Sequence, residues 1–82
     1  MHGIVRCMQS GFTRTKGVLA TNIRTFRLSA GLSQEDLALL AGIDRTYASQ
    51  IEREVSNPSL KVLCSLAEVL KVNLEDLLKP QN

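Results

Sequence analysis

The chain has 82 residues, a formal net charge of +2 and only 4% aromatic residues. Its length allows one domain at most, with a core so small that dimerisation would add to its stability. The scarcity of aromatics excludes a stacking platform for single strands, and no apolar run is long enough to span a membrane.

The charge is unevenly distributed, because no Asp or Glu precedes Glu35 while five basic residues do: Arg6, Arg14, Lys16, Arg24 and Arg27. Residues 1–16 are expected to form a flexible segment, since Gly3 and Gly11 interrupt it and no apolar periodicity survives. A solvated tail is the usual state of a chain terminus. A basic arm that touches nucleic-acid phosphate is the alternative. The folded domain is then expected to cover residues 17–79.

The first helix is predicted at residues 18–30, where Leu19, Ile23, Phe26 and Ala30 recur at helical spacing and give one apolar stripe. Gly31 is a natural C-terminal stop. Arg24 points away from the stripe, so its side chain is available to a phosphate.

Residues 33–53 read as two short helices joined by a tight turn. Ser33 is suited to cap the first helix, Gly42 stands where the chain reverses, and Asp44 is suited to cap the second. Two helices with a short Gly-containing turn are the sequence form of a helix-turn-helix. On the second helix the apolar side is marked by Tyr47, Ala48 and Ile51, and the outward side by Arg45, Thr46, Ser49 and Gln50. This outward set suits the reading of base edges in a DNA major groove.

Two further helices are predicted after Pro58, at residues 59–71 behind a Ser59 cap and at residues 74–79 behind an Asn73 cap. The fold class is therefore all-α with five helices. Cys64 is expected to be a small core residue. The dimer interface is expected at Leu74, Leu77 and Leu78, and the alternative for Leu77 is that it completes the core of the single chain. The predicted core comprises Leu19, Ile23, Phe26, Leu37, Ala38, Ile43, Tyr47, Ile51, Leu60, Leu63, Ala67 and Leu70.

The run from Gly42 to Arg53, GIDRTYASQIER, resembles the phage-repressor and Cro-like (Xre-type) helix-turn-helix family. It is more similar still to the controller proteins of restriction–modification systems. The resemblance covers residues 19–78 and implies a five-helix, lambda-repressor-like domain that binds double-stranded DNA as a homodimer on a two-fold operator. It departs from the family at Glu54, where Gly is usual after the recognition helix.

The resemblance also assigns roles to residues around the recognition helix. Arg45, Thr46, Ser49 and Gln50 would read bases, and Arg27 would form a structural ion pair with Glu52. Phosphate contacts are expected from Gln34, Tyr47, Asn57, Lys61 and Arg24. RNA polymerase is left open as a partner of the regulator.

Other readings stay open beside the controller role. The same family includes prophage-type repressors, antitoxins and general regulators, and some of its domains have become protein-interaction modules that no longer bind DNA. The polar outward face of the recognition helix argues against the last reading, because a protein-binding face would show apolar anchors.

Catalytic chemistry is not indicated by the sequence. Glu35 and Asp36, like Glu75 and Asp76, are neighbours that do not share a helix face, and His2 is the only histidine. We expect no enzyme, no metal and no cofactor. Cys7 and Cys64 have no metal-ligand spacing and are too few for a disulfide framework, so a reducing cytoplasm is the expected location.

Overall fold

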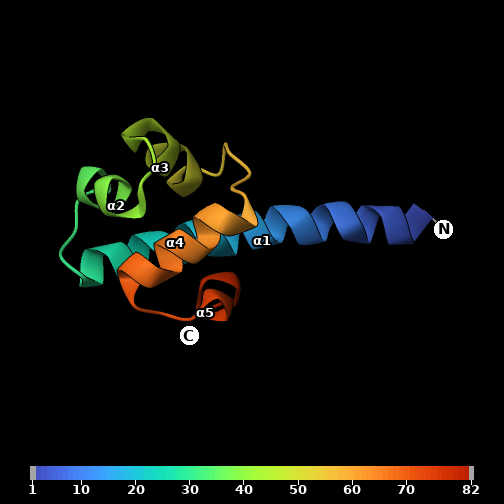
Figure 1. Ribbon diagram of the computed structural model, residues 1–82. Coiled ribbons are helices and arrows are strands. Elements are labelled where there is room, and N and C mark those ends of the chain that lie inside the picture. Colours follow the sequence, from blue (N-terminus) through green and yellow to red (C-terminus); the bar gives the residue numbers. More distant parts are fainter. Residues whose placement is uncertain (1, 82) are drawn as a thin grey trace.

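The computed structural model describes residues 2–81, with side chains described from Gly11 onward. These residues form five helices and no strand, which confirms the all-α prediction. The helices are α1 (His2–Ser29), α2 (Gln34–Ala41), α3 (Arg45–Glu52), α4 (Leu60–Leu70) and α5 (Leu74–Leu78). The long α1 runs through the molecule, with α2 and α3 on one side of it and α5 on the other (Figure 1).

The core lies where α1, α2, α3, α4 and α5 meet, and its buried residues are Leu19, Ile23, Leu37, Ile51, Leu63, Leu66, Ala67, Leu70 and Leu77. Two expectations for α4 were wrong, since Leu60 is 65% exposed and Cys64 is also exposed. Leu60 is the first residue of α4, and the buried side of the helix begins only at Leu63. Leu66, which is absent from the predicted core, is fully buried.

The predicted start of the first helix at residue 18 was wrong, whereas the flexibility expected of residues 1–16 stays a prediction. Helix α1 begins at His2, and residues 11–16 continue it without a break into the predicted helix. Gly11 and Gly17 are tolerated inside the helix, because a glycine weakens a helix by only about 1 kcal/mol and does not forbid it. In this part of the helix, Lys16 Nζ donates a hydrogen bond to the Glu54 carbonyl at 3.2 Å.

The caps and turns of the helix-turn-helix follow from single residues. The Ser33 hydroxyl accepts a hydrogen bond from the Asp36 N–H at 3.0 Å, and the Asp36 carboxylate accepts one from the Ser33 N–H at 3.2 Å. Gly42 has φ 72°, the left-handed conformation that ends α2 and turns the chain toward α3. Asp44 occupies the cap position of α3, but its side chain makes no capping hydrogen bond there, so that expectation was only partly right.

A buried amide fixes α5 to α1. Asn22 is 2% exposed, and its Nδ2 donates to the carbonyl oxygens of Leu77 at 2.9 Å and Lys79 at 2.8 Å. Carbonyls at the end of a helix have no partner within the helix, so this side chain replaces the missing donors. Helix α5 is therefore docked by a specific polar contact as well as by the burial of Leu77.

Candidate nucleic-acid interface

Helices α2 and α3 pack against each other, and each carries a small buried residue. Ala38 of α2 and Ala48 of α3 are each 2% exposed, and the Ile43 N–H donates to the Ala38 carbonyl at 2.9 Å. Ile51 and the half-buried Tyr47 pack toward the core on the inner side of α3. This packing fixes which side of α3 faces outward.

The outward side of α3 carries the four residues that the sequence assigns to base reading. Arg45 and Thr46 are exposed at the start of the helix, while Ser49 and Gln50 are half-buried one turn later. A cleft of about 190 Å³ lies along this side and is lined by Gln34, Arg45, Thr46 and Ser49. The start of α2 and the start of α3 therefore present one continuous polar surface, with a guanidinium, hydroxyls and amides as hydrogen-bonding groups.

Glu52 links this surface to the rest of the molecule. Its carboxylate accepts hydrogen bonds from Arg27 Nε at 2.6 Å, Arg27 Nη2 at 3.1 Å and Gln34 Nε2 at 3.1 Å. Arg27 Nη1 also donates to the Leu32 carbonyl at 2.9 Å. The carboxylate therefore joins α1, α2 and α3, and it holds Gln34 at the edge of the cleft.

Of the residues expected to contact phosphate, Gln34 lines the cleft. Arg24 on α1, Asn57 in the loop after α3 and Lys61 on α4 are exposed, whereas Tyr47 and Gln34 are half-buried. Gln34 uses one of its amide hydrogens on Glu52, which leaves the second hydrogen and the amide oxygen for other partners.

The loop between α3 and α4 begins with a strained residue. Glu54 has φ 63°, a left-handed conformation that glycine adopts freely and that costs a residue with a side chain about 1 kcal/mol. The Val55 N–H donates to the Gln50 carbonyl at 3.0 Å, so this turn closes the end of the recognition helix. Glu54 therefore adopts the left-handed conformation at a position where the family usually has glycine.

The predicted dimer interface needs a correction. Leu77 is 0% exposed and belongs to the core of the single chain, because α5 turns this side chain inward against α1 and α4. Leu74 is half-buried against the same core, and Leu78 is 39% exposed. On α5, only the exposed side that carries Leu78 is thus available to a second copy of the chain.

Sequence reasoning missed two contacts that shape this region. Asn22 looked like an ordinary polar position of α1, and Lys16 lay in the segment expected to be flexible, yet both donate to carbonyls more than 35 residues away in the chain. No local signal predicts such a long-range acceptor. Among the described residues, no cluster of side chains could hold a metal ion and no helix is long and apolar enough to cross a membrane.

A family model described as helix-turn-helix matches residues 23–77. The chain therefore belongs to the helix-turn-helix family of DNA-binding transcriptional regulators, which is not a class of enzymes. Within this family it is similar to the control protein C.SmaI of Serratia marcescens, with 40% identity over 85% of this chain and 83% of that protein.

Solved structures agree with this assignment. The hypothetical transcription factor NHTF from Neisseria superimposes with a TM-score of 0.79 at 44% identity, over 80% of this chain and 74% of that one. The restriction–modification controller protein C.AhdI from Aeromonas hydrophila gives a TM-score of 0.73 at 37% identity, over 76% of this chain and 94% of that one. The α2–α3 unit described above is thus the helix-turn-helix of a transcription regulator.

Proposed function

We propose that the protein is a restriction–modification controller, a homodimer that binds a two-fold operator at its own promoter and times the expression of a restriction endonuclease. The observation that carries this proposal is the match to C.SmaI, which extends over 85% of this chain and 83% of that control protein. The likeness to the structure of C.AhdI, which is described as a restriction–modification controller protein, supports it.

In this proposal α3 is the recognition helix. Its first residues reach the base edges, as is usual for a helix-turn-helix, and the two half-sites lie about 34 Å apart on one face of the duplex. Arg45 pairs with a guanine, because its fork matches the O6 and N7 acceptors, while Thr46, Ser49 and Gln50 contact neighbouring bases. Gln34, Tyr47, Asn57, Lys61 and Arg24 hold the backbone phosphates on either side.

A mobility-shift titration tests the proposal, with duplexes from the region upstream of the gene and a scrambled duplex of equal length as control. Tight binding of one upstream duplex, competed by itself and not by the scrambled duplex, is the expected result. Equal binding of both would point to a general DNA-binding protein, and no binding to either would favour a protein-interaction module.

The subtype is decided by the neighbouring genes and by a transcription assay. Adjacent endonuclease and methyltransferase genes are expected, and purified protein should change transcription from the endonuclease promoter in a reconstituted reaction with RNA polymerase. A prophage, antitoxin or unrelated gene neighbourhood would move the protein to another branch of the same family.

A further inference from the structure

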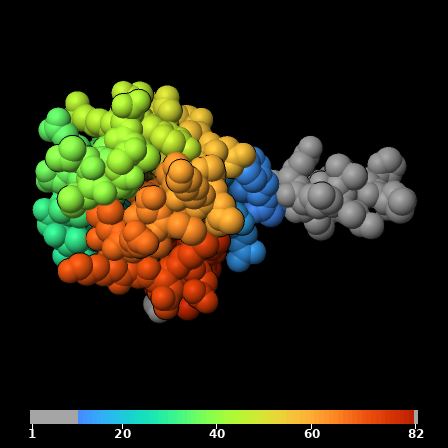
Figure 2. Space-filling model, in the orientation of Figure 1, coloured from blue at the N-terminus to red at the C-terminus, as the bar shows by residue number. Residues whose placement is uncertain are grey.

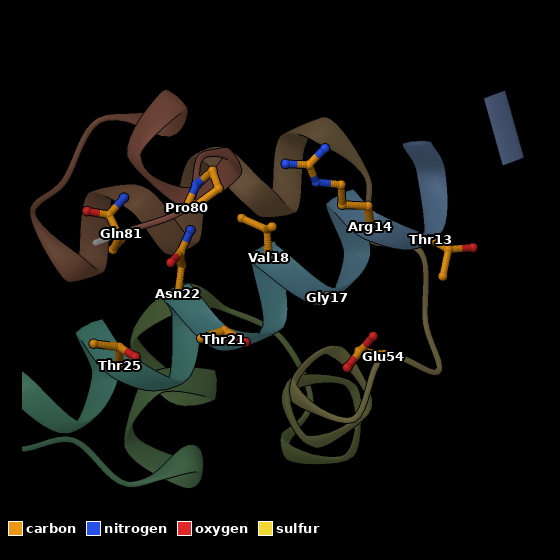
Figure 3. A pocket seen from close by; sticks show the side chains of 10 residues that line it. All are labelled: Thr13, Arg14, Gly17, Val18, Thr21, Asn22, Thr25, Glu54, Pro80 and Gln81. Carbon is orange, nitrogen blue, oxygen red and sulfur yellow. The ribbon is translucent and has the colours of Figure 1, made fainter. Parts of the chain in front are cut away.

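Residues 12–17 of α1 lie beside the loop that follows the recognition helix. Lys16 Nζ donates to the Glu54 carbonyl at 3.2 Å, and the same ammonium lies 5.1 Å from the centre of the Phe12 ring. Figure 3 shows the Glu54 side chain beside Gly17. A Cβ at Gly17 would lie only 3.3 Å from Glu54 Oε1, so the absence of a side chain permits this close approach.

Further along the loop, Asn57 faces α1 across a hollow. Phe12, Lys16 and Leu19 of α1 line a hollow of about 190 Å³ together with Asn57 and Pro58 of the loop. In Figure 2 the blue atoms of α1 adjoin the orange atoms of the region around residue 60, at the edge of the molecular body. The loop therefore contacts α1 at Glu54, and its residues Asn57 and Pro58 face the same hollow as Phe12 and Lys16.

The strain at Glu54 makes a stabilising contact from α1 important for the loop conformation. Glu54 adopts the left-handed conformation at a cost of about 1 kcal/mol, which weakens the preference of the loop for this one geometry. A charged donor on the Glu54 carbonyl opposes any rotation of that peptide, since hydrogen bonds from ionised donors are stronger than neutral ones. Asn57, a proposed phosphate contact, follows three residues later.

We propose that Lys16 is a positioning residue for DNA binding: it holds the loop after α3 in the conformation that presents Asn57 to a backbone phosphate. This inference rests on the proposed function, because it takes Asn57 to be a phosphate contact. It assigns to the N-terminal part of α1 a role in operator affinity that lies outside the helix-turn-helix itself.

Lys16→Met tests the proposal, and Arg14→Met is its matched control. Each change removes one positive charge from the same stretch of α1, and methionine keeps the apolar stem of the side chain. Arg14 points away from Glu54, toward the side of α1 where Val18 and Pro80 lie (Figure 3). Circular dichroism establishes that both variants keep the helical content of the wild type.

Operator affinity is then measured for each variant in the wild-type and the Asn57→Ala backgrounds. Lys16→Met should weaken binding about fivefold in the wild-type background and hardly at all in Asn57→Ala, because coupled residues give non-additive losses. Arg14→Met should have the same small effect in both. A Lys16→Met loss that persists in Asn57→Ala, or equal losses for Lys16→Met and Arg14→Met, would mean direct attraction between a basic arm and DNA and would overturn the proposal.

Glu54→Gly provides a rescue. Glycine adopts φ 63° without strain, so the loop should keep its geometry without help from Lys16. The Lys16→Met loss of affinity should therefore shrink when Glu54→Gly is also present. An undiminished loss would contradict the idea that Lys16 acts through the loop.

Amide hydrogen exchange separates this inference from the proposed function, because it needs no DNA. Lys16→Met should speed exchange of the Val55 N–H, which is bonded to the Gln50 carbonyl, and Arg14→Met should not. Unchanged exchange in Lys16→Met would overturn the inference even if the wild type binds its operator. If the wild type binds no upstream duplex, the proposed function fails, and exchange still decides whether Lys16 holds the loop.

Discussion

Glu52 is the residue through which the recognition helix is oriented. Its side chain is only 4% exposed and that of its partner Arg27 is 10% exposed, so the pair is shielded from water. The removal of two charges from water offsets much of their attraction, and such a pair adds little net stability over apolar residues of the same size. Its effect is on geometry, because one carboxylate fixes α1, α2 and α3 relative to one another.

Loss of either partner should nevertheless destabilise the fold, because the remaining charge stays buried without a counterion. We expect Arg27→Ala and Glu52→Ala each to lower the free energy of unfolding by about 3 kcal/mol. Thermal unfolding measures this, with Lys79→Ala as control. Lys79 lies 3.5 Å from Asp76 with a side chain that is 61% exposed, and an exposed pair contributes less than about 1 kcal/mol. An unchanged melting temperature in Arg27→Ala would show that the pair does not matter.

Arg45 and Lys61 should differ in the kind of loss that they cause. Arg45→Ala should cost about 1–3 kcal/mol of operator binding and relax the preference at one base position, since a fork on guanine reads sequence. Lys61→Ala should weaken binding to all sequences alike and reduce the salt dependence by about one unit of slope. Binding-site selection and salt titration distinguish the two. An unchanged consensus at unchanged affinity in Arg45→Ala would remove Arg45 from the base readout.

At the scale of the elements, a helix end could be predicted from the sequence where a residue only a few positions away determines it. Ser33, Gly42 and Ser59 each act within four residues of their own position, so the start and end of α2 and the start of α4 could be predicted from them. The left-handed geometry of Glu54 was likewise suggested by the family position that it occupies. The outward side of α3 followed from the spacing of Ala48 and Ile51.

The elements that sequence reasoning placed wrongly depend on distant partners. The early turns of α1 look unstructured in isolation, since their glycines disfavour a helix and the Glu54 carbonyl that Lys16 contacts is 38 residues away. The helical period of α4 fits Leu60 as well as Leu66, and only the position of the neighbouring helices decides that Leu66 is buried. The helical period predicts which face of α4 is buried, but it does not show how far along that face the neighbouring helices extend.

Gly11 offers a direct test of the early turns of α1. A Cβ at this position would have no neighbouring atom within 4 Å apart from the backbone of its own helix. Gly11→Ala should therefore stabilise this part of the helix by about 0.5–1 kcal/mol. Amide exchange of residues 11–16 should slow in Gly11→Ala and quicken in Gly11→Pro. Rapid exchange of these amides in all three proteins would show that the segment is unfolded in solution.

At the scale of the whole molecule, one core joins all five helices. Outside it, seven large apolar side chains of the described residues stay exposed: Phe12, Leu28, Leu39, Leu40, Val55, Leu60 and Leu78. Leu78 of α5 and Phe12 of α1 line the same hollow and are 39% and 49% exposed. Exposed apolar surface of this kind is where small domains associate. In a two-fold dimer the same patch meets its own copy, so a single substitution alters the interface twice.

Leu77 and Leu78 should therefore give opposite results, although they are adjacent in the sequence. Leu77→Ala should cost about 3 kcal/mol of stability, because it removes a fully buried side chain from the core, and Leu77→Glu should prevent folding. Leu78→Glu should leave the fold intact, since its side chain is partly in water, and should convert the dimer to monomers that bind one half-site weakly. Analytical ultracentrifugation with circular dichroism checks both outcomes. A folded, fully dimeric Leu78→Glu would place the interface away from α5, and a folded Leu77→Glu would show that α5 does not complete the core of the single chain.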